Sequence, residues 1–120
     1  MALTEEQLRL LSEAKEVRIE TSSSRGPRST IIWIVVVDGR VYVRSVRAEE
    51  GHWYRRALSN PDVAILVAGQ RIPFRAVLVE DPEEIDQVTE ALRAKYPAGG
   101  SLDRMTRDEV LAHTLRLEPV

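Results

Sequence analysis

The stretch that decides the fold is TIIWIVVVDGRVYVRSVR, which runs from Thr30 to Arg47. Its first half, Thr30–Val37, is the most apolar run of the chain and is rich in Val and Ile, which is typical of a strand covered on both faces. Asp38-Gly39 then supplies a two-residue hairpin turn, because both residues tolerate positive φ. We therefore predict a strand over Thr30–Val37, a tight turn, and a returning strand over Arg40–Arg47.

A two-residue turn also fixes the register of this hairpin. The expected facing pairs are Val37 with Arg40, Val35 with Tyr42, Trp33 with Arg44, and Thr30 with Arg47. Since side chains alternate between the two faces of a strand, Ser45 and Arg47 should share one face with Thr30, and Arg44 should lie opposite Trp33 on the other. Two hydroxyls and a guanidinium on one face suit a phosphate group.

Other interpretations of these side chains stay open. Arginines at strand ends also point into solvent or pair with carboxylates, and Glu49 and Glu50 are adjacent here. Trp33 and Trp53 are residues of the kind that packs into a core or an interface as well as against a bound ring. A short helix expected over Gly51–Asn60 would bring its first amides, and Arg55 or Arg56, toward the same anion.

The rest of the chain adds shorter elements. Thr4 and Gln7 match a capping box, which predicts a helix over residues 4–14, and alternation predicts a strand over Val17–Ser23 followed by a polar loop over Ser22–Ser29. We further expect strands over Asp62–Ala68 and Arg71–Glu80, helices over residues 82–96 and 102–111, and a closing strand over residues 113–119. This order favours one α+β domain over residues 1–120, a six-stranded and mostly antiparallel barrel with helices, with an open sandwich as the alternative.

Composition excludes several kinds of chemistry. The 120 residues carry a net charge of −2 and include no cysteine, which excludes thiol nucleophiles, thiolate metal sites and disulfides. His52 and His113 are far apart and lack acidic partners at metal-ligand spacing, so we expect no metal site. The sequence contains no phosphate-loop or dinucleotide fingerprint, and Ser22–Ser24 lacks the context of a hydrolase nucleophile.

Charge and hydropathy indicate where the protein works. Between Arg25 and Arg56 seven arginines face three carboxylates, which would suit an anion, but the overall acidity and the scarcity of lysine argue against a nucleic-acid surface. If binding weakened steeply with rising salt concentration, a function as an anion or nucleic-acid binder would be favoured instead. No apolar run approaches the ~20 residues of a membrane span, and Met1–Leu11 lacks a signal-peptide pattern. We expect a cytoplasmic protein without a membrane partner.

The segment from Val17 to Asp81 resembles the pyridoxamine-phosphate-oxidase-like split barrels. The shared pattern is a strand ending in Thr, a polar loop, an apolar strand, an Asp-Gly hairpin, a strand ending in a Ser/Arg motif, then Trp, Asn-Pro and a new strand. This superfamily includes flavin-binding oxidases and deazaflavin-dependent nitroreductases, and the sequence is most similar to an uncharacterised bacterial branch, a domain of unknown function.

The resemblance implies a six-stranded Greek-key split barrel that forms a homodimer, with FMN or a deazaflavin coenzyme bound at the subunit interface. The cofactor ring would lie along Ile31–Ile34, which includes Ile32 and Trp33, and would do the hydride transfer. The residues implied for the phosphate or tail are Thr30, Arg44, Ser45, Arg47, Arg55 and Arg56, with Trp53 nearby. The expected function is a reductase of a small organic substrate; the alternative is a binding protein of the same fold without catalysis.

Overall fold

A computed structural model of the protein describes residues 2–120. The helices are α1 (Glu5–Glu13), α2 (His52–Ser59), α3 (Pro82–Lys95), α4 (Gly100–Thr106) and α5 (Asp108–Leu111), with a 3-10 turn, η1 (Ala48–Glu50). The strands are β1 (Val17–Ser23), β2 (Gly26–Ile32), β3 (Val35–Val37), β4 (Arg40–Arg44), β5 (Asp62–Val67), β6 (Gln70–Leu78) and β7 (Thr114–Pro119).

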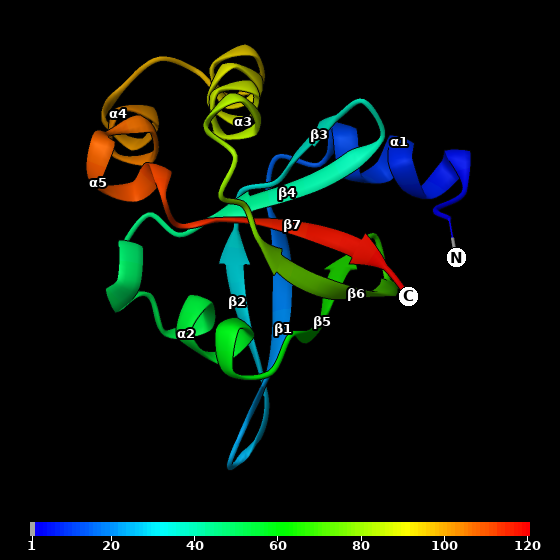
Figure 1. Cartoon of the computed structure of the whole chain (residues 1–120). Coiled ribbons are helices and arrows are strands. Elements are labelled where there is room, and N and C mark those ends of the chain that lie inside the picture. Colours follow the sequence, from blue (N-terminus) through cyan, green and yellow to red (C-terminus); the bar gives the residue numbers. More distant parts are fainter. Residues whose placement is uncertain (1) are drawn as a thin grey trace.

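The strands form one curled antiparallel sheet, in the order β2-β1-β5-β6-β7-β4-β3. Figure 1 shows α3, α4 and α5 on one side of this half-barrel and α2 on another, while the β1–β2 hairpin projects beyond the body. The α+β class and the antiparallel split-barrel architecture are as predicted. Within residues 2–120 the sheet has seven strands, whereas the sequence indicated six.

The extra strand arises because the apolar run is broken. β2 ends at Ile32 and β3 begins at Val35. The pairs Val35–Tyr42 and Val37–Arg40 confirm the hairpin register. The predicted pairs farther from the turn are wrong: Thr30 pairs with Ile19 of β1, and Trp33 lies in the break. The physical cause is a set of long-range hydrogen bonds, described below, that occupies the backbone of Ile34.

The prediction of a loop over Ser22–Ser29 is also wrong. In the structure β1 and β2 form a regular hairpin, in which Val17 pairs with Ile32 at one end and Ser23 pairs with Gly26 at the turn. Gly26 adopts a φ of 99°, which a residue with a side chain rarely tolerates, and this makes the sharp reversal possible. The side chain of Ser23 stabilises the turn by donating a hydrogen bond to the carbonyl of Gly26 at 2.6 Å.

Two apolar clusters hold the fold together. The larger fills the inside of the curled sheet and includes Ile19, Ile65 and Phe74. The smaller lies between the other face of β3 and β4 and the helices α3 and α4, and includes Tyr42 and Val88. Helix α3 therefore covers the outer face of β4, and this decides the surroundings of Arg44.

The C-terminal helical region differs in detail from the expectation. The helix indicated over residues 102–111 is two short helices, α4 and α5, because the backbone of Arg107 is extended between them. Among residues 2–120 no helix is both long and apolar enough to cross a membrane. The same residues contain no cluster of three or more His, Cys, Asp or Glu that could hold a metal ion.

Candidate functional site

A pocket of about 440 Å³ opens where β2 ends, beside the loop that joins β4 to α2. Four segments make its walls: the residue before β1, the end of β2 with the strand break, the end of β4 with the β4–α2 loop and the first turn of α2, and α4. The lining residues are Glu16, Thr30–Trp33, Arg44–Arg47, Gly51–Trp53, Ser101, Arg104 and Met105. The volume lies within the ~300–1,000 Å³ that is usual for small-molecule sites.

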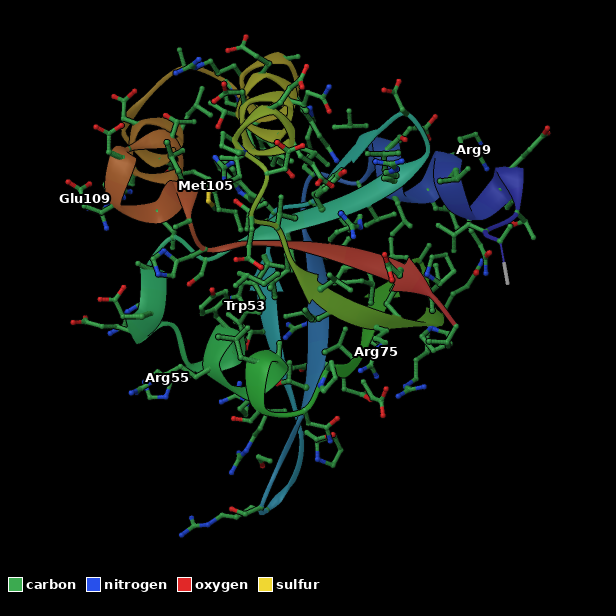
Figure 2. All side chains as sticks on the ribbon, in the orientation of Figure 1. Arg9, Trp53, Arg55, Arg75, Met105 and Glu109 are labelled. Carbon is green, nitrogen blue, oxygen red and sulfur yellow. The ribbon has the colours of Figure 1, made fainter. Side chains whose placement is uncertain are left out.

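The apolar wall of the pocket contains both tryptophans. Ile32 and Trp53 are each 7% exposed and belong to the core of the half-barrel. Figure 2 shows Trp53 directed from α2 toward the strands. Trp33 is half-buried and stacks on Tyr96, with ring centroids 3.9 Å apart and planes 3° apart. Trp33 therefore presents to the pocket only the parts of the indole that the stack leaves free.

Tyr96 and Lys95 hold this indole in place by occupying the strand break. The amide of Ile34 donates to the Tyr96 hydroxyl at 3.0 Å, and that hydroxyl donates to the carbonyl of Lys15 at 2.7 Å. The Lys95 ammonium donates to the carbonyl of Ile34 at 2.7 Å and to that of Leu11 at 3.2 Å. Burial, together with the nearby charge of Lys15, lowers the pKa of Lys95 to about 8.

Arg44 is buried, not at the rim of the pocket. The residue is 2% exposed. Its guanidinium donates to the side chains of Thr114 (2.8 Å) and Thr89 (2.9 Å) and to the carbonyls of Ile85 (3.1 Å) and Met105 (3.3 Å). Burial lowers the pKa of Arg44 to about 10, against the opposing charge of Asp86. Arg44 thus joins β4 to β7, α3 and α4, and it lends the pocket a fixed positive charge.

Ser45 shapes the pocket through its loop. Its hydroxyl is buried and donates to the carbonyl of Ala48 at 2.8 Å, so it stabilises the turn. Ala48 has a φ of 54°, an uncommon conformation for a residue with a side chain. A methyl group added at Gly51 would lie 2.4 Å from the Ser45 hydroxyl oxygen, so any larger residue at this position has to displace that hydroxyl from its hydrogen bond.

The exposed cations of the site are Arg47 and Arg104. Both are solvent-exposed and line the pocket, Arg47 from the β4–α2 loop and Arg104 from α4. In the described part of the chain neither forms an ion pair with a carboxylate, and the Arg104 side chain donates only a long bond of 3.4 Å to Ser101. Counting Arg44, the pocket lining contains three guanidiniums and a single carboxylate, that of Glu16. The pocket therefore attracts anions.

The structure brings together seven of the nine residues singled out from the sequence. These are Thr30, Ile32, Trp33, Arg44, Ser45, Arg47 and Trp53. It does not bring Arg55 and Arg56 to this pocket, because they leave α2 on another side and line a separate hollow. Thr30 and Arg47 meet at the pocket although they are not paired across a hairpin.

Sequence reasoning missed the contribution of α4, namely Ser101, Arg104 and Met105. These residues lie more than 50 positions beyond Arg47 in the chain. The one sequence signal was a basic residue in a short helix after Gly99-Gly100, and this does not by itself indicate which part of the barrel the helix covers.

Comparisons with solved structures place the fold. A putative pyridoxamine 5'-phosphate oxidase from Listeria innocua superposes with a TM-score of 0.69 at 17% identity, over 95% of this chain and 90% of its own. HutZ, the heme storage protein from Vibrio cholerae, gives 0.73 at 20% identity, over 100% and 92%. An F420-H2 dependent reductase gives 0.64 at 17% identity, over 87% and 94%. At these identities the likeness shows the fold alone.

Among curated proteins, no sequence matches this chain. Residues 7–117, in contrast, match the profile of a family described as an uncharacterized protein conserved in bacteria (DUF2255). The match covers nearly the whole chain, so this split-barrel protein belongs to the DUF2255 family of bacteria.

Proposed function

We propose that the pocket binds a flat redox cofactor of the flavin or deazaflavin class and that the protein is a reductase of a small organic substrate. The observation that carries this proposal is the composition of the pocket. An apolar, tryptophan-bearing wall lies beside three arginines that face one carboxylate. Such a pocket suits a ligand that combines a large apolar ring with an anionic tail.

The residues present fit such a group. Arg47 and Arg104 are exposed at the pocket and available to donate to the phosphate or carboxylates of the tail, and Thr30 adds a hydroxyl from β2. Ile32 and Trp53 are buried, so they would keep water from the edge of the ring. Trp33, fixed by Tyr96, would pack against the ring. When bound, the cofactor supplies hydride transfer, and the protein supplies position and electrostatics.

Arg44 and Ser45 have supporting roles in this proposal. The Ser45 hydroxyl is committed to the carbonyl of Ala48, and four protein oxygens accept the hydrogen bonds of Arg44. Arg44 then acts mainly through its charge, which favours an anionic ligand, and by holding α4 as a wall of the pocket. The structures of similar fold include a putative pyridoxamine 5'-phosphate oxidase and an F420-H2 dependent reductase, which supports the same class of chemistry.

The proposal includes a homodimer with the pocket at its subunit interface. Ile31 lines the pocket and is 52% exposed, so a large apolar side chain at the edge of the pocket is open to solvent. Its cross-strand neighbour is Arg18, which in turn pairs with Leu66 of β5, so the three side chains lie in one row across the sheet. A second copy of the chain would cover this row and close the pocket.

A second candidate is a binding protein that performs no reduction. His52 favours it, since this imidazole is exposed and lines the pocket, and histidine is a common ligand of haem iron. HutZ, a heme storage protein, has a similar fold. This candidate shares the pocket with the first and differs in the ligand and in the absence of turnover.

The test is a titration of the purified protein with FMN, a deazaflavin coenzyme and hemin, followed by absorbance and fluorescence. We expect saturable binding of FMN or the deazaflavin, and oxidation of the reduced cofactor by a nitroaromatic probe substrate. Arg47→Met should weaken binding about tenfold, the effect of one charge-assisted hydrogen bond. Arg93→Met, on the exposed face of α3, is the matched control. No binding of either cofactor at about 1 mM, or binding of hemin alone, would refute the proposed reductase.

A further inference from the structure

A second hollow, of about 500 Å³, lies between the tip of the β1–β2 hairpin and the C-terminal half of α2. Its lining consists of Ser22–Ser24, Arg55, Arg56, Ser59 and Asn60. The lining contains no carboxylate and no apolar side chain. Because the Ser23 hydroxyl already donates to the carbonyl of Gly26, the lining offers two guanidiniums, three further serine hydroxyls and an amide. Donor groups of this kind, without an opposing negative charge, suit an oxyanion.

Arg56 is held in place for such a role. Its Nε donates to the side-chain oxygen of Thr21 at 2.8 Å, and Thr21 is 1% exposed. In the described part of the chain the two terminal nitrogens of Arg56 have no hydrogen-bond partner, so they are available to a ligand. Since the guanidinium is planar, fixing Nε also fixes the direction of the terminal nitrogens and reduces the entropy lost on binding.

Arg55 supplies the second charge without any structural duty. It is exposed and lines the hollow. Figure 2 shows its side chain extended into solvent, so its terminal nitrogens would turn toward the hairpin tip when a ligand binds. The C-terminal end of α2 also lies at this hollow and brings a partial negative charge of about half a unit. Two full positive charges outweigh this partial charge, so the hollow stays positive.

The hollow is separate from the first pocket. Ser23 pairs with Gly26 at one end of the hairpin, whereas the pocket begins at Thr30–Ile32 at the other. At the usual rise of a strand, the four steps from Gly26 to Thr30 span ~13 Å and the six steps to Ile32 span ~20 Å. Helix α2 lies between the two sites, with His52 and Trp53 at the pocket and its second half at the hollow.

We propose that this hollow is a second binding site, which takes a compact oxyanion of the phosphate type, such as the phosphate group of a small metabolite. The site does not depend on the proposed cofactor. A phosphate group would accept from the terminal nitrogens of Arg56, from Arg55 and from the hydroxyls of Ser22 and Ser24 at the hairpin tip.

The experiment is a titration of the isotope-labelled protein with inorganic phosphate at constant ionic strength, followed by the backbone amide signals of Ser22–Ser24 and Ser59-Asn60. We expect saturable shifts confined to these residues. Arg55→Gln should weaken binding at least fivefold, whereas Arg93→Gln, which removes the same charge from α3, should leave it unchanged. Thr21→Val removes the anchor of Arg56 but no charge, and it should weaken binding severalfold.

Two further arms make the result decisive. Shifts that sodium chloride reproduces with the same slope would show charge screening only and would overturn the proposal, as would equal affinities in Arg55→Gln and Arg93→Gln. The titration is repeated with the first pocket saturated by FMN. We expect unchanged phosphate affinity; competition would mean that the phosphate of the pocket ligand occupies the hollow, and a separate site would be refuted.

Discussion

Arg44 and Arg47 are three residues apart, yet they differ in role: Arg44 holds the fold together, and Arg47 is available to a ligand. The same substitution at each position separates the two roles. In Arg44→Met the sheet loses its connection to α3 and α4, because four hydrogen bonds from the guanidinium disappear. In Arg47→Met an exposed side chain without an ion pair among residues 2–120 is shortened. We expect the first change to destabilise the fold and the second to weaken ligand binding.

The magnitude for Arg44 follows from two opposing effects. Hydrogen bonds from a charged donor contribute roughly 1.5–3 kcal/mol each, and four are lost. Against this, methionine removes the cost of burying the charge, which is about 3 kcal/mol because the pKa falls from 12.5 to about 10. Four such bonds contribute roughly 6–12 kcal/mol, so the net loss is at least about 3 kcal/mol. The roughly 3–5 kcal/mol that breaking a buried charged network usually costs sets the expected loss at about 4 kcal/mol. For a domain of this size Tm should fall by ~15 °C.

The assay is thermal and urea unfolding of both variants, with FMN titration of each folded protein. Arg47→Met should unfold within about 0.5 kcal/mol of the wild type, as surface substitutions do, and should bind FMN about tenfold more weakly. A Tm of Arg44→Met within 3 °C of the wild type, on a scale of ~4 °C per kcal/mol, would refute the structural role of Arg44. Equal loss of stability in the two variants would refute the separation of their roles.

Three further predictions concern the loop, the strand break and the interface. Gly51→Ala should destabilise the protein by about 1–3 kcal/mol in urea unfolding, because the new methyl group displaces the Ser45 hydroxyl. Adding Ser45→Ala should recover part of this loss. A Gly51→Ala variant as stable as the wild type would contradict the geometry. The folded protein lowers the pKa of Lys95 from 10.5 to about 8, so between pH 8 and 10.5 the unfolded chain binds more protons than the folded one. The wild type should therefore gain stability relative to Lys95→Met as the pH rises from 8 to 10.5. A constant or shrinking difference in unfolding free energy would contradict the burial of this ammonium group. Ile31→Glu should convert a wild-type dimer into a monomer in sedimentation velocity, and a monomeric wild type would refute the proposed interface.

The sequence predicted the parts of the fold that local chemistry decides. The Asp38-Gly39 turn set the register of β3 and β4, because a two-residue hairpin allows few alternatives. The capping box at Thr4 and Gln7 is present in the structure and begins α1. The split-barrel class followed from the order of the elements and from the family resemblance.

The parts that could not be predicted depend on distant residues. Nothing within Thr30–Val37 signals the break at Trp33, since the backbone partners of Ile34 come from Lys95 and Tyr96, about 60 positions away. Arg44 was expected to face Trp33, but α3 and α4 cover that face of β4 and bury the guanidinium. The cytoplasmic location and the absence of a nucleic-acid partner stay predictions.

The central claim is that the pocket beside Trp33 binds a flat, anionic cofactor, and the two tryptophans of the chain provide a direct probe. Both indoles line the pocket, and the sequence contains no others. Two-dimensional NMR should therefore show two indole N–H signals, both of which shift and saturate as FMN or a deazaflavin is added, with Arg47→Met requiring about tenfold more ligand. If both signals stay unmoved with either cofactor up to about 1 mM, the pocket does not hold this class of ligand, and the account of its function is wrong.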